Sequence, residues 1–228
     1  MPPALRSVAS SDAGPVRPRN CDSFHVGPSV LAVADGVDDA PFGDVASALA
    51  VDHVRRLEEA PGTLAAAAHA ANTALRTRGA QTPALLGMGT TLLAVRLEGS
   101  ALSWVSFGDS ALHLLRDGVL STLTPAEDVI RSLVAEGRVE ADGLVAPALL
   151  DGGSLFVVAQ QALEVGAGDR LLLGTRGLAE LAAEDLHAAL SVPEPGPESA
   201  VMALVEAARA ASAAENLTVV VADVVEAP

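Results

Sequence analysis

The middle of the chain consists of four short apolar segments with turn residues between them. One of the breaks is the pair Asp117-Gly118, and an Asp-Gly pair between two apolar runs is a strong signal for a β-hairpin. The block therefore predicts consecutive antiparallel strands and argues against the strand–helix alternation of a parallel α/β sheet. The predicted strands cover residues 89–97, 101–107, 111–116 and 119–123.

Apolar residues at helical spacing lie on both sides of this strand block. Helices separated in this way from antiparallel strands define an α+β layout. A chain of 228 residues forms a substantial core without a second domain, so we expect one domain over residues 1–228. The predicted helices cover 44–59, 63–78, 125–136, 178–190 and 197–211, and the further strands cover 30–34, 152–159, 170–174 and 217–225.

The charge balance disfavours nucleic acid as a partner. The chain has 29 acidic against 14 basic residues, every basic residue is Arg, and the formal net charge is -15. Binding to nucleic acid depends on Lys and Arg side chains that neutralise phosphates. Only 2% of the residues are aromatic and none is Tyr, so surfaces on which bases could stack are also poorly supplied.

Cysteine usage and hydropathy bear on the compartment. The single cysteine, Cys21, excludes a disulfide within the chain and a zinc site built on several thiolates. The first residues lack the apolar run of a secretory signal, and no window holds the roughly 20 apolar residues of a membrane span. We therefore expect a cytoplasmic protein that does not bind membranes. We also expect a monomer.

Three common catalytic signatures are absent. Residues 87–92, Gly-Met-Gly-Thr-Thr-Leu, contain the first two glycines of a dinucleotide fingerprint, but Leu92 stands at the third position and a strand is predicted to follow. A chain without Lys has no phosphate-binding P-loop, and no Gly-x-Ser-x-Gly elbow occurs. The five histidines show no zinc-ligand spacing, so a core or surface imidazole is the better interpretation of each.

Acidic residues at predicted turns are the more informative feature. Hard divalent cations such as Mg²⁺ bind carboxylate and carbonyl oxygens from loops beside rigid strands. Taken singly, each of these residues more often serves as a turn or cap residue. The candidate oxygen donors are Asp22, Asp35 with the carbonyl of Gly36, Asp38, Asp39, Asp109 and Glu215.

The order and context of six motifs add to this pattern. They are Arg-Pro-Arg-Asn-Cys-Asp-Ser-Phe at 17–24, Val-Ala-Asp-Gly-Val-Asp-Asp at 33–39, Gly-Met-Gly-Thr-Thr at 87–91, Gly-Asp-Ser at 108–110, Leu-Leu-Leu-Gly-Thr-Arg-Gly-Leu at 171–178 and Glu-Asn-Leu-Thr-Val-Val-Val at 215–221. In this order they resemble the PPM-type family, the metal-dependent type 2C serine/threonine protein phosphatases. The resemblance covers nearly the whole chain.

The resemblance implies both a fold and an activity. The fold is a four-layer αββα sandwich, in which two packed antiparallel sheets are flanked by helices. The activity is hydrolysis of phosphoserine or phosphothreonine in proteins. In the family, two Mg²⁺ or Mn²⁺ ions activate a bridging water that attacks the phosphoryl group, while an arginine clamps phosphate oxygens.

The family's functional residues can be carried over by motif position. Arg17 would clamp the phosphate. Asp35 would be the catalytic carboxylate that bridges the metals, and Gly36 would supply a carbonyl ligand. Asp22 would hold metal-bound water, and Asp109 stands where a third, weaker ion binds in some relatives.

Several positions depart from the family pattern. Arg176 stands where the family has an Asp that ligates the first metal, and a guanidinium has no acceptor atom. Cys21 replaces a Glu with a softer ligand. Glu215, still a candidate metal ligand, replaces an Asp and is one methylene longer. Asp38 and Asp39 replace two glycines, and a role as turn caps is favoured over a role as compensating ligands.

Two functions follow from these departures. One is a divergent phosphatase with weak or lost catalysis. The other is a pseudophosphatase, a module that binds a phosphoprotein or a signalling partner without turnover. In the second case Arg176 and Arg17 would grip phosphate together, or Arg176 would pair with Asp35 or Glu215 and only neutralise them. At most one tightly bound Mn²⁺ or Mg²⁺ is expected.

Overall fold

The computed structural model describes residues 2–37, 42–124, 161–192, 196–211 and 214–227. Within these ranges the strands form two five-stranded antiparallel sheets. The first, called here the β10 sheet, runs in the order β1 (Pro3–Asp12), β10 (Leu217–Glu226), β9 (Arg170–Gly174), β6 (Ala111–Arg116) and β7 (Val119–Thr122). The second, called the β3 sheet, runs in the order β2 (Asp22–Val26), β3 (Val30–Asp35), β4 (Leu92–Glu98), β5 (Ala101–Phe107) and β8 (Gln161–Glu164).

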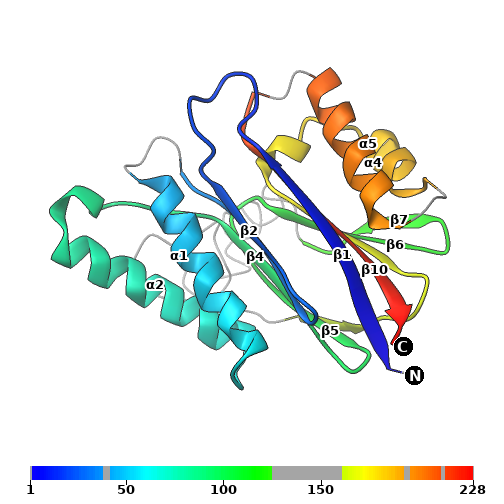
Figure 1. Ribbon diagram of the computed structural model, residues 1–228, viewed down its shortest axis with the longest axis horizontal. Helices are drawn as coiled ribbons and strands as arrows, with labels where there is room; N and C mark the ends of the chain where they lie inside the picture. Colours follow the sequence, from blue (N-terminus) through cyan, green and yellow to red (C-terminus); the bar gives the residue numbers. More distant parts are fainter. Residues whose placement is uncertain (1, 38–41, 125–160, 193–195, 212–213, 228) are drawn as a thin grey trace, which may run out of the picture.

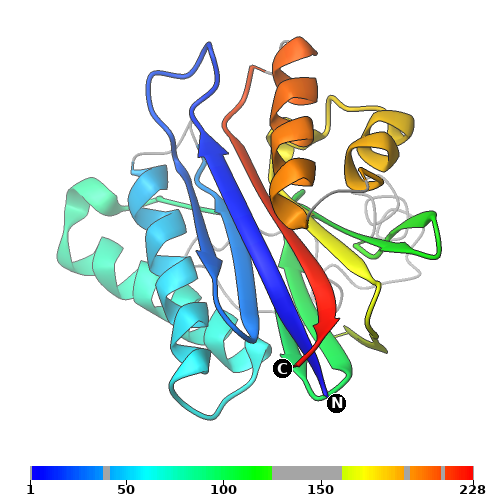
Figure 2. The ribbon, with the colours of Figure 1, turned by 45° about the vertical axis from the view of Figure 1, so that its right-hand side comes forward.

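Helices cover the outer face of each sheet (Figure 1). On the β3 sheet lie α1 (Gly43–Arg55) and α2 (Leu64–Gln81), and on the β10 sheet lie α4 (Ala183–Leu190) and α5 (Pro197–Ala210). Turned by 45°, the chain shows its first and last strands side by side between these helix pairs (Figure 2). In the described part of the chain, three short 3₁₀ helices connect elements, namely η1 (Arg56–Glu58), η2 (Pro83–Leu85) and η3 (Arg176–Leu178).

Strand β3 shows how the layers are packed. Its alternate residues Val30, Ala32 and Ala34 face the helices α1 and α2, while Leu31 and Val33 face the β10 sheet. All five are fully buried, because the β3 sheet is covered on both faces. A third buried cluster lies between β10 and the helices α4 and α5. The three clusters fill the three interfaces of a four-layer αββα sandwich, as the family resemblance implied.

The structure confirms the α+β layout and the predicted strand block, but the sequence analysis missed the N-terminal strands β1 and β2 and the short strand β8. Strand β1 pairs with β10 along its whole length, from Pro3↔Glu226 to Asp12↔Leu217. No local turn announces a partner so distant in sequence, and β1 contains few large apolar residues. Pairing at this range follows from tertiary packing and cannot be predicted from local propensity.

Two predicted helices are shorter than expected, and two predicted elements lie outside the described residues. The helix expected over 44–59 ends at Arg55 and is followed by η1, and the helix expected over 178–190 begins only at Ala183, after η3 has ended at Leu178. The predicted helix at 125–136 and strand at 152–159 fall outside the described ranges, as do Asp38 and Asp39. Each helix within the described ranges is too short or too polar to cross a membrane.

Candidate functional site

Antiparallel pairing brings the predicted site residues to one end of the sandwich. In the β3 sheet, Asp22 at the start of β2 lies directly opposite Asp35 at the end of β3. In the β10 sheet, Gly174 at the end of β9 lies opposite Val219 near the start of β10. Arg176 follows the first of these strands and Glu215 precedes the second. Residues from distant motifs therefore meet because strand ends meet.

The backbone around Asp35 is held from two directions. Its N–H donates to the hydroxyl of Thr91 at 2.8 Å, and its carbonyl accepts from the hydroxyl of Thr90 at 3.0 Å and from the N–H of Thr91 at 2.8 Å. The hydroxyl of Thr91 also lies 3.0 Å from that of Ser110, beside Asp109. This network fixes the position from which the Asp35 carboxylate projects.

Gly36 lies where three backbone segments touch. A Cβ at this position would overlap the carbonyls of Gly43 and Cys21, so no other residue fits without displacing the start of α1 or the start of β2. The N–H of Gly36 donates to the Cys21 carbonyl at 3.2 Å. Ser47 on α1 donates to the same carbonyl at 2.6 Å. The glycine thus permits the close packing that brings Asp22 beside Asp35.

Two side chains that the sequence analysis did not single out join the sheets at this end. The hydroxyl of Thr175 donates to Asp22 at 2.8 Å and accepts from the N–H of Thr218 at 2.9 Å. The Asn216 side-chain carbonyl accepts from the N–H of Cys21 at 2.8 Å, and its amide nitrogen donates to the carbonyls of Ala13 and Arg19. Thr175 lies inside the motif at 171–178 and Asn216 inside the motif at 215–221. Their positions in these motifs were the sequence signal that could have identified them.

Arg176 points its guanidinium at Asp109. Its Nε donates to Oδ2 of Asp109 at 2.6 Å, and 58% of the arginine side chain is exposed against 21% of the aspartate. The hydrogen bond and charge of Asp109 raise the pKa of Arg176, and the charges of Asp35 and Glu215 raise it further. The arginine therefore hydrogen-bonds one carboxylate and lies within electrostatic range of two others.

A second arginine pairs with the carboxylate that precedes β10. Arg17 donates from Nε and Nη2 to Oε2 of Glu215 at 3.0 and 2.6 Å. Both side chains are about a third exposed, with values of 32% and 28%. Two carboxylates expected as metal ligands, Asp109 and Glu215, thus each hold an arginine.

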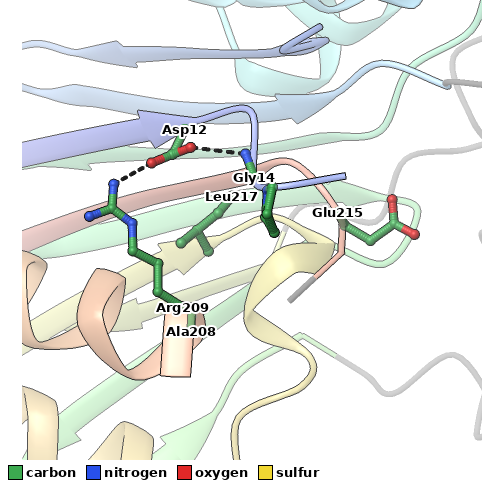
Figure 3. Close-up of a pocket in the computed structure, with 7 residues that line it drawn as sticks. Asp12, Gly14, Ala208, Arg209, Glu215 and Leu217 are labelled. Carbon is green, nitrogen blue, oxygen red and sulfur yellow. Dashed lines mark hydrogen bonds and ion pairs between the residues drawn. The ribbon is translucent and has the colours of Figure 1, made fainter. Parts of the chain in front are cut away.

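Glu215 also lines a hollow with a volume of about 320 Å³. Within it, Arg209 pairs with Asp12 at 2.5 Å and Asp12 accepts from the N–H of Gly14. The carboxylate of Glu215 is turned away from this pair (Figure 3). The ion pair in the hollow is therefore separate from the Arg17–Glu215 pair. The lining residues are Asp12, Gly14, Pro15, Ala208, Arg209, Glu215 and Leu217.

Comparisons with known proteins identify the family, although no family model matches the chain. The serine/threonine protein phosphatase PstP of Mycobacterium tuberculosis is 38% identical over 237 aligned positions, which cover 97% of this chain and 45% of PstP. A crystal structure of the same enzyme has a TM-score of 0.86 at 36% identity and covers 98% of this chain and 100% of that one. The PPM Ser-Thr phosphatase MsPP of Mycobacterium smegmatis has a TM-score of 0.79 at 31% identity, covering 96% and 98% of the chains. The chain belongs to the PPM family of serine/threonine phosphatases.

This PPM domain spans about half the length of the curated relatives that it matches. The catalytic domain of PstP, at 37% identity and a TM-score of 0.86, has been solved in complex with two manganese ions. That finding agrees with the Mn²⁺ or Mg²⁺ expected for the family. It raises the question of whether the side chains of this domain suit two such ions.

The donor set within the described ranges does not fit a two-ion centre. In the described part of the chain, no three His, Cys, Asp or Glu side chains are grouped so that they could hold a metal. Asp109 and Glu215 bind arginines, and Arg176 itself has no acceptor atom. A thiol at Cys21 is a poor ligand for a hard cation. Among the candidates that the structure describes, the other oxygen donors are those at Asp22, Asp35 and Gly36.

Proposed function

We propose that this PPM domain engages phosphoserine or phosphothreonine on a partner protein and that its metal-assisted hydrolysis is weak or lost. The observation that carries the proposal is the position of Arg176. A guanidinium that hydrogen-bonds Asp109 stands at the position where the family resemblance implies a metal-ligating Asp. Exchange of a carboxylate for a guanidinium changes the local charge by two units and removes the ligand atoms.

The two arginines supply the phosphate-binding side of the proposal. Arg17 is held by Glu215, and Arg176 is held through its Nε by Asp109. Among the described residues, Nη1 and Nη2 of Arg176 have no hydrogen-bond acceptor. That edge of the guanidinium can bind two oxygens of a phosphate in parallel, which is the geometry that makes arginine selective for phosphate.

The charge of the site favours one kind of phosphopeptide. Arg17 pairs with Glu215, and Arg176 pairs with Asp109 and lies within electrostatic range of Asp35. The whole chain has a net charge of -15. A phosphate flanked by acidic residues would be repelled from such a site. We therefore expect basic residues beside the phosphorylated residue of the partner, with binding that weakens as salt screens the attraction.

A second candidate, a slow phosphatase, is favoured by the β3 sheet. Asp22 lies opposite Asp35, and Gly36 keeps the close backbone packing beside them. These three residues would retain one divalent ion at most. Turnover would then depend on Asp35 and would be far below that of a two-ion enzyme.

Hydrolysis of p-nitrophenyl phosphate in excess Mn²⁺ separates the two candidates. The variants are Asp35→Ala, Arg176→Asp and Arg176→Asp/Cys21→Glu. We expect little or no turnover by the wild type and increased turnover by the variants that restore carboxylates. Wild-type turnover that disappears in Asp35→Ala would exclude the pseudophosphatase and leave the phosphatase.

Binding of a fluorescent phosphoserine peptide with basic flanks tests recognition directly. The Arg176→Lys substitution keeps the charge but loses the bidentate geometry, and we expect about a tenfold loss of affinity, equivalent to about 1.4 kcal/mol. Arg6→Lys is the matched control, because Arg6 forms an exposed pair with Glu198 outside the site. Equal affinity for the phosphorylated and unphosphorylated peptides would exclude the proposed recognition.

A further inference from the structure

Four carboxylates from both sheets gather at the site end of the sandwich. Asp22 and Asp35 belong to the β3 sheet, Asp109 lies in the turn between β5 and β6, and Glu215 precedes β10. Like charges at short range repel, and the cost grows where solvent is partly excluded. Cations at the same end reduce this repulsion and stabilise a fold that brings these carboxylates together.

Arg176 is placed to supply such a cation across the two sheets. It follows β9 of the β10 sheet, and Asp109 lies in the turn through which the chain passes from β5 of the β3 sheet to β6 of the β10 sheet. Their hydrogen bond of 2.6 Å therefore joins η3 to the connection between the two sheets. The charges of Asp35 and Glu215 also act on the guanidinium and, after Asp109, contribute to its raised pKa.

The backbone that carries Arg176 has little freedom to move. A Cβ on the next residue, Gly177, would overlap the carbonyl of Asn216 and the Cα of Leu217. The preceding residue, Thr175, is buried and bonded to both Asp22 and Thr218. The η3 turn thus holds the guanidinium at a fixed place, although the side chain itself is largely exposed.

We propose that Arg176 is a built-in cation that replaces divalent metal in holding the carboxylates of the two sheets together, so that this domain folds without metal. In this proposal, the guanidinium of Arg176 supplies positive charge where the donor set does not fit two metal ions. The proposal concerns stability, and it stands whether or not the domain hydrolyses or binds phosphoproteins.

The Arg209–Asp12 pair provides a matched comparison. It has a similar distance of 2.5 Å and similar exposure, with 65% of the arginine and 34% of the aspartate exposed. Exposed pairs of this kind contribute little to stability. If Arg176 neutralises several carboxylates, its removal must cost more than removal of Arg209, and only the loss at 176 should be recovered by a divalent ion.

Thermal unfolding of the full chain, followed by circular dichroism in EDTA and in Mn²⁺, tests the proposal. We expect the wild-type domain to be folded in EDTA and to gain less in Tm from Mn²⁺ than Arg176→Gln gains. Arg176→Gln should lower the Tm in EDTA by about 2–4 °C, the shift that about 1 kcal/mol produces in a chain of this size, and Mn²⁺ should restore it. Arg176→Lys should resemble the wild type, and Arg209→Gln should show no recovery by Mn²⁺.

Three results would overturn the proposal. The first is a wild-type Tm that Mn²⁺ raises by as much as it raises the Tm of Arg176→Gln, because the fold would then still use a metal in place of the arginine. The second is a loss in Arg176→Gln that Mn²⁺ does not reverse, and the third is equal behaviour of Arg209→Gln. Arg176→Asp adds a stronger variant. If it is unfolded in EDTA, recovery of the folded spectrum in Mn²⁺ supports the proposal and absence of recovery contradicts it.

Discussion

The two sheets contribute different chemistry to the same end of the molecule. The β3 sheet presents Asp22, Asp35 and the carbonyl of Gly36, all oxygen donors of the kind that hard cations bind. The β10 sheet presents Arg176, which pairs with Asp109, and Glu215, which pairs with Arg17. One half of the site therefore keeps a metal-ligand character while the other half is occupied by guanidinium groups.

The backbone of the two halves does not differ in this way. Gly36 in the β3 sheet and Gly177 after β9 both lie where a Cβ would overlap a neighbouring carbonyl. The same end of the fold is therefore tightly packed on both sides, while the charges of the side chains differ. The comparison teaches that a family fold fixes where side chains meet but does not fix what chemistry they perform.

The largest predicted effect concerns this shared backbone. Gly36→Ala and Gly177→Ala should each lower the free energy of unfolding by about 3 kcal/mol, because the added methyl group must displace backbone atoms. Urea unfolding followed by circular dichroism measures the loss. Gly166→Ala is the control, since nothing lies near the added Cβ there, and its effect should stay within about 0.5 kcal/mol. If either of these two substitutions leaves the free energy of unfolding unchanged, the half of the site that contains it is less tightly packed than the structure indicates.

The next effect concerns the contact between the halves. Thr175→Val keeps the shape of the side chain but removes the hydroxyl that bonds Asp22 and the N–H of Thr218. A buried polar group that loses its hydrogen-bond partner costs about 1–3 kcal/mol of stability. Chemical denaturation should therefore show that the free energy of unfolding of the variant falls by an amount in this range. Thr77→Val on the exposed face of α2 serves as the control and should change stability far less.

The smallest predicted effect is the pH dependence of stability that arises from histidines outside the site. Burial lowers the pKa of His113 in β6 below its ordinary value of 6.5. The unfolded chain therefore binds a proton more readily, so stability is complete above pH 6.5 and declines as the pH falls below that value. Desolvation also lowers the pKa of His25 and His53, which adds to the same decline.

His113→Asn should reduce this decline while keeping a polar group near Thr122, the hydrogen-bond partner of His113. Urea unfolding between pH 7 and 5 measures it. His69→Asn on the exposed face of α2 is the control, and its pH profile should match that of the wild type. A His113→Asn profile as steep as the wild type would assign the decline to other groups, including those of the site.

Local signals explain which parts of the fold could be predicted. The strands between residues 92 and 122 follow one another through short turns, so turn chemistry and apolar runs were sufficient. Strand β1 was missed because its partner β10 is at the other end of the chain. The single domain over residues 1–228 stays a prediction, as do the cytoplasmic location and the monomeric state.

The sequence predicted which residues lie at the site better than it predicted which of them pair with one another. The motifs led to Asp35, Arg17 and Arg176, and the structure brings all three to one end of the sandwich. The hydrogen bond from Arg176 goes to Asp109, whereas the sequence analysis considered Asp35 and Glu215, which act through charge alone in the interactions resolved for Arg176. A sequence cannot choose among three nearby carboxylates, because the choice depends on the direction of a long side chain from η3.

Counting the Mn²⁺ ions bound by the wild-type domain tests the central claim most directly. Isothermal titration with Mn²⁺, alongside Arg176→Asp/Cys21→Glu, measures the number of tight sites on each protein. The arrangement of Arg176 with Asp109 and of Arg17 with Glu215 predicts at most one tight site on the wild type and an additional site on the double variant. Two tight sites on the wild type would contradict the claim that guanidinium groups occupy half of this centre.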